Sequence, residues 1–247
     1  MIRKLLMGIA LLAAVGFHAS AMFMPAFGRP VGEIAARLPV VFMPSIYASL
    51  ILLILVPLLG LYVIRGGGPA ERPATANLRT ALFIAASMFH MIELIAWQEE
   101  RFLLFLVSDV AMLAVLAALY FTYPKTENRL SGRVPISGIF SYFFFSLLVG
   151  IHYTLEENDW GGLGLSDALW AIITLTFAAA VALHFLYHHK DDVFAGVFAW
   201  MSLMVALRNG LDEPLVSAAS LFLAGAVIAW MIISKRQSRN VPRTAED

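Results

Sequence analysis

Eight long apolar segments constrain what this chain can fold into more than any other feature of its sequence. A helix needs about 20 apolar residues to cross the roughly 30 Å hydrocarbon core of a bilayer. Hydrophobic residues make up 60% of the 247 residues and charged residues only 14%, a balance typical of a polytopic membrane protein. We therefore predict an all-α, polytopic transmembrane bundle of about eight helices. The expected segments are 4–24, 41–64, 79–98, 102–123, 134–155, 166–188, 193–208 and 214–234.

Several functional classes find no support in the composition. The formal net charge is zero, so we expect no nucleic-acid partner. Cysteine is absent, which excludes disulfides, thiolate metal sites and cysteine nucleophiles. No nucleophile–base pair or metal-ligand set stands out, so enzymatic activity has the least support and no metal site is predicted.

Basic residues predict the orientation of the chain. With the N-terminus inside, thirteen of the 17 Lys and Arg residues fall on the inner side. Only Arg29, Arg37, Arg101 and Arg208 fall outside, a strong positive-inside bias. Both termini are then cytoplasmic, and residues 235–247 form a basic cytoplasmic tail. Residues 1–21 have the form of a cleavable signal peptide as well as of a retained first helix, and the sequence leaves both open.

The longest polar interruption before the C-terminal tail, residues 25–44, follows the first apolar segment. Prolines at positions 30, 39 and 44 prevent one continuous helix, because each removes a backbone donor and restricts the residue before it. It also keeps apolar residues such as Ile34 and Phe42, so we expect it to fold back over helix ends as a lid. The alternative is an ordinary connector. The charged lid residues expected to gate a site are Arg29, Glu33 and Arg37.

Ionisable residues at membrane depth are costly and therefore mark candidate functional sites. His90, Glu93 and Trp97 share one face of the third segment, and Asp109 lies in the fourth. Counted from the turn at Glu100, His90 and Asp109 both lie roughly 13–15 Å below the outer surface. We predict that His90, Glu93 and Asp109 form a polar cluster under the lid, in which one carboxyl holds a proton if the two approach each other. The alternative is a structural hydrogen-bond network between helices.

Histidines also leave a haem hypothesis open. His18, His90 and His152 all fall in the outer halves of apolar segments, and axial histidine pairs on facing helices suit a membrane cytochrome. No further ligation motif supports this alternative, so haem or porphyrin is considered only as a possible ligand.

The chain resembles a known family in several motifs. From Gly28 to Pro44 it reads Gly-Arg-x-x-Gly-Glu-Ile-x-x-Arg-x-Pro-Val-x-Phe-x-Pro and runs into a helix with Tyr47 at its start. Further motifs are Trp97-x-x-Glu100, Arg133-x-Pro135 and His152-Tyr153-Thr154. Together they resemble the longer bacterial tryptophan-rich sensory proteins, relatives of the TspO/translocator family.

This resemblance implies a fold, a function and a location. It implies a TspO-like five-helix region over residues 1–160 and three additional transmembrane helices over residues 161–234, in the cytoplasmic membrane of a bacterium. It also implies binding, sensing or transport of a hydrophobic small molecule, tetrapyrrole- or sterol-like, beneath the first loop. Alternatives are a proton-coupled small-molecule transporter and a non-catalytic accessory subunit, and the protein could form a homodimer or join a larger membrane complex. The expected ligand-binding residues are His90, Glu93, Trp97, Asp109, Tyr47 and Tyr142.

Overall fold

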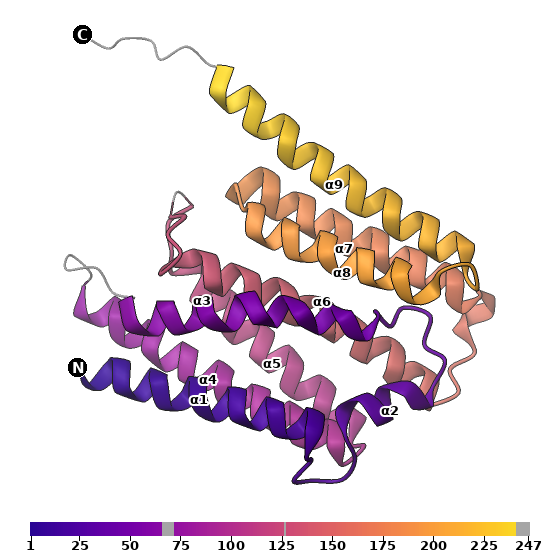
Figure 1. Ribbon diagram of the computed structural model, residues 1–247, viewed down its shortest axis with the longest axis horizontal. Helices are drawn as coiled ribbons and strands as arrows, with labels where there is room; N and C mark the ends of the chain where they lie inside the picture. Colours follow the sequence, from indigo (N-terminus) through magenta and orange to yellow (C-terminus); the bar gives the residue numbers. More distant parts are fainter. Residues whose placement is uncertain (66–71, 126, 241–247) are drawn as a thin grey trace.

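The structure of the protein is a computed structural model that describes residues 1–65, 72–125 and 127–240 (Figure 1). The described residues form helices and no strand, which confirms the predicted all-α bundle. Seven helical segments are long and apolar enough to cross a membrane, and α8 is the long helix outside this group. The elements are α1 (Ile2–Phe23), α2 (Val31–Arg37), η1 (Ile46–Ile51), α3 (Leu52–Arg65), α4 (Pro73–Gln98), α5 (Phe102–Phe121), α6 (Arg133–Glu157), η2 (Gly162–Gly164), α7 (Asp167–His189), α8 (Asp192–Asn209) and α9 (Pro214–Asn240).

Helix boundaries differ from the predicted segments mainly where proline acts. The segment expected to start at residue 41 becomes helical only at Ile46, because Pro44 cannot continue a backbone hydrogen-bond ladder. In contrast, α4 starts at Pro73, six residues before the expected 79, since proline is well suited to the first turn of a helix. The last helix continues to Asn240, through the first part of the expected tail, and residues 241–247 lie outside the described residues.

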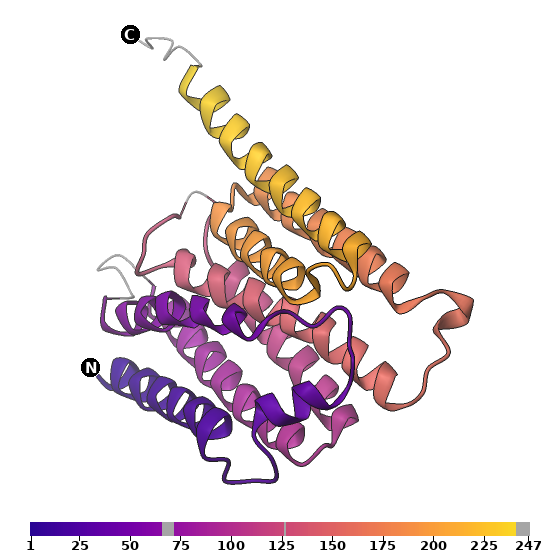
Figure 2. The same cartoon turned by 45° about the vertical axis from the view of Figure 1, so that its right-hand side comes forward.

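The long helices run back and forth along one common direction. The start of α1 and the end of α9 lie on the same side of the bundle, and the short helix α2 lies on the opposite side (Figures 1 and 2). Helices α7 and α9 pack on α8, and α8 in turn packs on α6 and η1. One continuous group of buried apolar side chains extends through all of these helices. Helix α8 therefore connects α7 and α9 to the helices that precede them in the chain.

A buried carboxylate ties α5, α6 and α8 together at the end of the bundle opposite α2. The hydroxyl of Tyr120 donates to Asp191 Oδ2 at 2.7 Å, and the hydroxyl of Ser137 donates to Asp191 Oδ1 at 2.8 Å. The backbone N–H groups of Val193 and Phe194 also donate to Oδ1, at 3.1 and 3.0 Å, so Asp191 caps the start of α8. We call Asp191 and these four partners the polar lock.

Candidate functional site

A cavity of about 470 Å³ lies between α1, η1–α3, α4, α5 and α6. Most of its lining is apolar, as expected for a site at membrane depth, and α3 and α4 stand apart across it. Its size is within the usual range for pockets that bind drug-sized molecules. The polar residues of the lining are His18, Ser49, Ser87, His90 and Tyr142, and its aromatic residues besides the histidines are Phe23, Phe83, Tyr142 and Phe143.

Two histidines on the cavity wall lead to a buried carboxyl group. His18 Nδ1 lies 3.2 Å from His90 Nε2, with the two rings stacked at a centroid distance of 5.3 Å. His90 Nδ1 lies 2.9 Å from Glu93 Oε1, one helical turn further along α4. Both ring nitrogens of His90 are therefore engaged, one with α1 and one with its own helix.

A second carboxyl group stands behind the first. Asp109 on α5 lies close to Glu93, and the residues are 0% and 4% exposed. Among the described residues, no N–H or O–H donor serves Glu93 Oε2 or either carboxyl oxygen of Asp109. Two buried carboxyl groups that lie close together without a donor are too costly to ionise together, so we expect the pair to hold a proton. We call His18, His90, Glu93 and Asp109 the relay.

The structure separates the six expected ligand-binding residues into three groups. His90 and Tyr142 line the cavity. Glu93 and Asp109 are outside the lining, and Glu93 contacts the lining residue His90. Trp97 and Tyr47 are outside the lining, since Trp97 packs further toward α2 and Tyr47 is exposed on η1.

Trp97 contacts the lid and does not line the cavity. Its indole N–H donates to the carbonyl oxygen of Val31 in α2 at 3.3 Å. Its ring packs against Phe102, Phe105 and Tyr153 at centroid distances of 5.5, 5.0 and 4.8 Å. The hydroxyl of Tyr153 donates to the Ile34 carbonyl at 2.7 Å. This aromatic group is the platform on which α2 lies.

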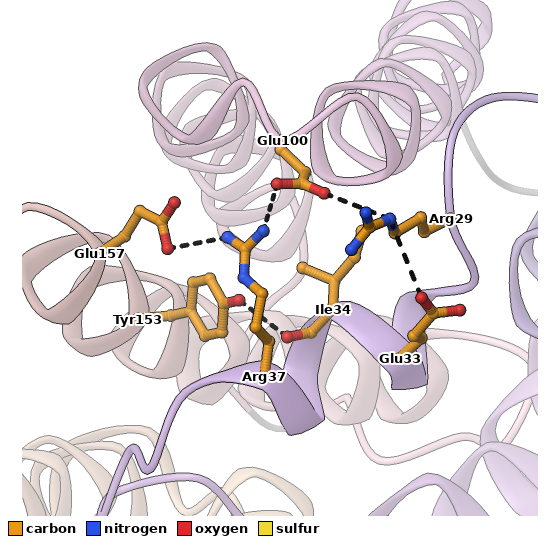
Figure 3. A network of polar contacts seen from close by, with 7 residues as sticks. All are labelled: Arg29, Glu33, Ile34, Arg37, Glu100, Tyr153 and Glu157. Carbon is orange, nitrogen blue, oxygen red and sulfur yellow. Dashed lines mark hydrogen bonds and ion pairs between the residues drawn. The ribbon is translucent and has the colours of Figure 1, made fainter.

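The ion pairs of Arg37 with Glu100 and Glu157, which we call the charged clamp, also hold α2 against the bundle (Figure 3). Arg37 donates to Glu157 Oε2 at 2.8 Å, at the end of α6, and to Glu100 in the turn between α4 and α5. The hydrogen bond to Glu100 is the largest cause that raises the pKa of the Arg37 guanidinium above its usual value. An arginine guanidinium is charged throughout the neutral range in any case, and these bonds favour its charged form further. Arg29 makes longer contacts, 3.8 Å to Glu33 and 3.8 Å to Glu100.

We expect Arg37→Gln to loosen the lid while leaving the bundle folded. The substitution removes both ion pairs of Arg37, to Glu100 and to Glu157, so the amides of Val31–Arg37 should exchange hydrogen at least several-fold faster. Hydrogen–deuterium exchange measured by mass spectrometry tests this. Arg29→Gln is the matched control, because its ion pairs are long and the Arg29 side chain is 57% exposed, so it should change exchange little. Equal exchange in both variants would contradict the clamp.

The lid covers helix ends and not the cavity itself. No described residue between 25 and 45 lines the cavity, whereas Met22 and Phe23 at the end of α1 do. The later part of the first loop is anchored on the other side, where Asn209 donates to the Val41 carbonyl at 2.9 Å and the Ser45 N–H donates to the Met204 carbonyl at 2.9 Å. Any influence of Arg29, Glu33 and Arg37 on the cavity would therefore act through the helix ends.

The histidines do not meet as a haem-ligating set in this arrangement. His90 already uses both ring nitrogens, and His152 contacts Thr174 at 2.8 Å and stacks on Phe42. The described residues contain no group of three or more His, Asp or Glu side chains arranged to hold a metal ion. The sequence analysis includes His18 only as a candidate haem ligand, whereas the structure places it beside His90 in the relay. Like His90, His18 is an ionisable residue at membrane depth, and this signal could have identified it.

The described residues form helices only, with seven segments long and apolar enough to cross a membrane and a mostly apolar cavity between five elements, as in a multi-pass membrane protein. The sequence model of the TSPO-like protein family matches residues 4–233, and the chain belongs to this family. The match extends over α7, α8 and most of α9, beyond the five helices to which the motifs pointed. Searches of curated proteins and of solved structures found no significant match.

Proposed function

We propose that the protein binds a hydrophobic small molecule in the cavity between α1, η1–α3, α4, α5 and α6. The observation that carries this proposal is the cavity itself, about 470 Å³ and largely apolar, with a few polar groups converging on it. The protein would lie in the cytoplasmic membrane of a bacterium with both termini in the cytoplasm. The resemblance to tryptophan-rich sensory proteins makes tetrapyrroles and sterols the first natural compounds to test.

The route into the cavity is lateral in this proposal. At one end of α1 the Lys4 ammonium donates to the Ile64 carbonyl at 2.6 Å, which holds α1 and α3 together. At the other end the lining includes Phe23 and Leu53, which are 81% and 72% exposed and so face the bilayer. A hydrophobic ligand dissolved in the membrane would therefore enter between the diverging ends of α1 and α3.

We expect Ala14→Phe to abolish binding by filling the cavity. Ala14 is a buried lining residue of α1, and a phenyl ring there occupies the ligand's volume. Saturable fluorescence of N-phenylnaphthylamine, a neutral hydrophobic probe, measures binding to the protein in lipid nanodiscs, with protein-free discs as background. Ala13→Phe is the matched control, because Ala13 is exposed and lies outside the lining. No saturable binding to the unaltered protein, or equal binding by both variants, would overturn the proposed site.

A further inference from the structure

We propose that the cavity takes an amphipathic organic cation in exchange for one proton that the relay releases. This inference rests on the proposed function and deepens it, because it names the chemical class of the ligand. Its basis is geometric: a continuous chain of hydrogen bonds connects the cavity wall at His18 to a carboxyl pair that is fully enclosed by protein.

The chain has two internally consistent protonation states. In the first, the carboxyl pair holds one proton, with Asp109 donating to Glu93. His90 then donates its Nδ1 proton to Glu93 and accepts at Nε2 from His18, whose Nε2 is left as a bare acceptor. The relay carries a net charge of −1 in this state.

In the second state the relay holds one more proton, and the two hydrogen bonds that join Glu93, His90 and His18 have their donor directions reversed. Glu93 now donates to His90, which donates from Nε2 to His18, and His18 carries its proton on Nε2. Asp109 still donates to Glu93, so the relay is neutral. The two states differ by one proton, and among the described residues His18 Nε2 has no other hydrogen-bond partner, so the proton enters and leaves at this nitrogen.

The surroundings decide which state is favoured when the cavity lacks a ligand. Titratable side chains reach the relay from α1 (His18), α4 (His90 and Glu93), α5 (Asp109) and α6 (Tyr142), and η1–α3 contributes none to the lining. None of the described lining residues is Lys or Arg. A net negative charge without a counter-ion is costly at membrane depth, so the neutral state with the extra proton is favoured.

An organic cation supplies the missing positive charge. When it occupies the cavity, the His18 Nε2 proton leaves to solvent, one proton shifts from His90 to His18, and one shifts from Glu93 to His90. The cation and the relay, now −1, together remain neutral. The ring faces of Phe23, Phe83, Tyr142 and Phe143 line the same cavity and favour a cation that also has apolar bulk.

Tetraphenylphosphonium tests the proposal, because it is hydrophobic, permanently charged and has no proton of its own to release. We expect saturable binding to the full-length protein in nanodiscs, with about one proton released per cation, measured by titration calorimetry in two buffers of different ionisation enthalpy. The dissociation constant should fall by about tenfold for each unit of rising pH where the neutral state predominates. Glu93→Gln combined with Asp109→Asn should weaken cation binding at least tenfold and abolish the proton release.

The neutral probe N-phenylnaphthylamine separates this inference from the proposed function. Circular dichroism of the double variant checks that the bundle is still folded, and undiminished proton release by this variant would overturn the exchange. Asp192→Asn, an exposed carboxylate on α8, is the control that should alter neither ligand. If the neutral probe binds and tetraphenylphosphonium does not, or if the cation binds without proton release, the exchange is overturned and the binding function stands. If neither ligand binds, the proposed function fails as well.

Discussion

Asp191→Ala should lower the free energy of unfolding by about 3–5 kcal/mol, the largest effect of any single substitution considered. Four donors converge on this carboxylate, from Tyr120, Ser137, Val193 and Phe194. A buried polar group left without its partner costs about 1–3 kcal/mol, and this substitution leaves several such groups at once. It also removes the side chain that caps α8. Reversible unfolding in mixed detergent micelles, followed by circular dichroism, measures the change.

The neighbouring residue provides the control for the polar lock. Asp192 makes one exposed ion pair with Lys235 at 2.9 Å, and pairs of this kind contribute about 0–1 kcal/mol. Asp192→Ala should therefore be nearly neutral, although it removes the same chemical group one position away. A destabilisation by Asp191→Ala no greater than that by Asp192→Ala would show that the polar lock does not hold α8 against α5 and α6.

The helices of this fold follow from hydropathy, because a polypeptide in a bilayer must satisfy its backbone groups within each span. Depth in the membrane also predicts part of the relay. Glu93 and Asp109 lie at similar distances from the tight turn between α4 and α5, and the hairpin brings them into contact. Sequence spacing can predict this contact because both residues belong to adjacent antiparallel helices joined by a short turn.

The cavity could not be predicted in the same way. It exists because α3 and α4 stand apart while α1 and α6 close the sides, and this separation depends on how side chains from five elements pack. Trp97 shares a helical face with His90 but lies two turns further along α4, where it meets α2 instead of the cavity. Tyr47 is on a 3₁₀ turn, which places its side chain differently from the α-helix expected there. His18 faces His90 only because of the rotation of α1, which spacing within α1 does not reveal.

The turn that brings the lid back to the bundle depends on a single glycine. Gly28 has a φ of +52°, in the left-handed region where other residues are strained. A Cβ atom at this position would lie 1.9 Å from the carbonyl oxygen of Gln98. The same carbonyl accepts from the Arg29 N–H at 3.4 Å, and the Gln98 side-chain oxygen accepts from the Phe27 N–H at 3.3 Å. The turn therefore lies directly against the end of α4 with no room for a side chain.

Gly28→Ala should detach this turn and destabilise the docked lid. The left-handed backbone alone costs about 1–2 kcal/mol for a residue with a Cβ, and the overlap with the Gln98 backbone carbonyl adds to this because backbone must shift to relieve it. We expect faster hydrogen exchange over Val31–Arg37 and a lower midpoint of thermal unfolding.

Gly32→Ala is the matched control, since a Cβ there meets nothing within 4 Å. In a helix the same change stabilises by up to about 1 kcal/mol. If Gly28→Ala lowers the midpoint of thermal unfolding and Gly32→Ala raises it, the turn at Gly28 is the constrained position. Similar changes in the midpoint for both variants would show that the lid does not depend on close contact between Gly28 and α4.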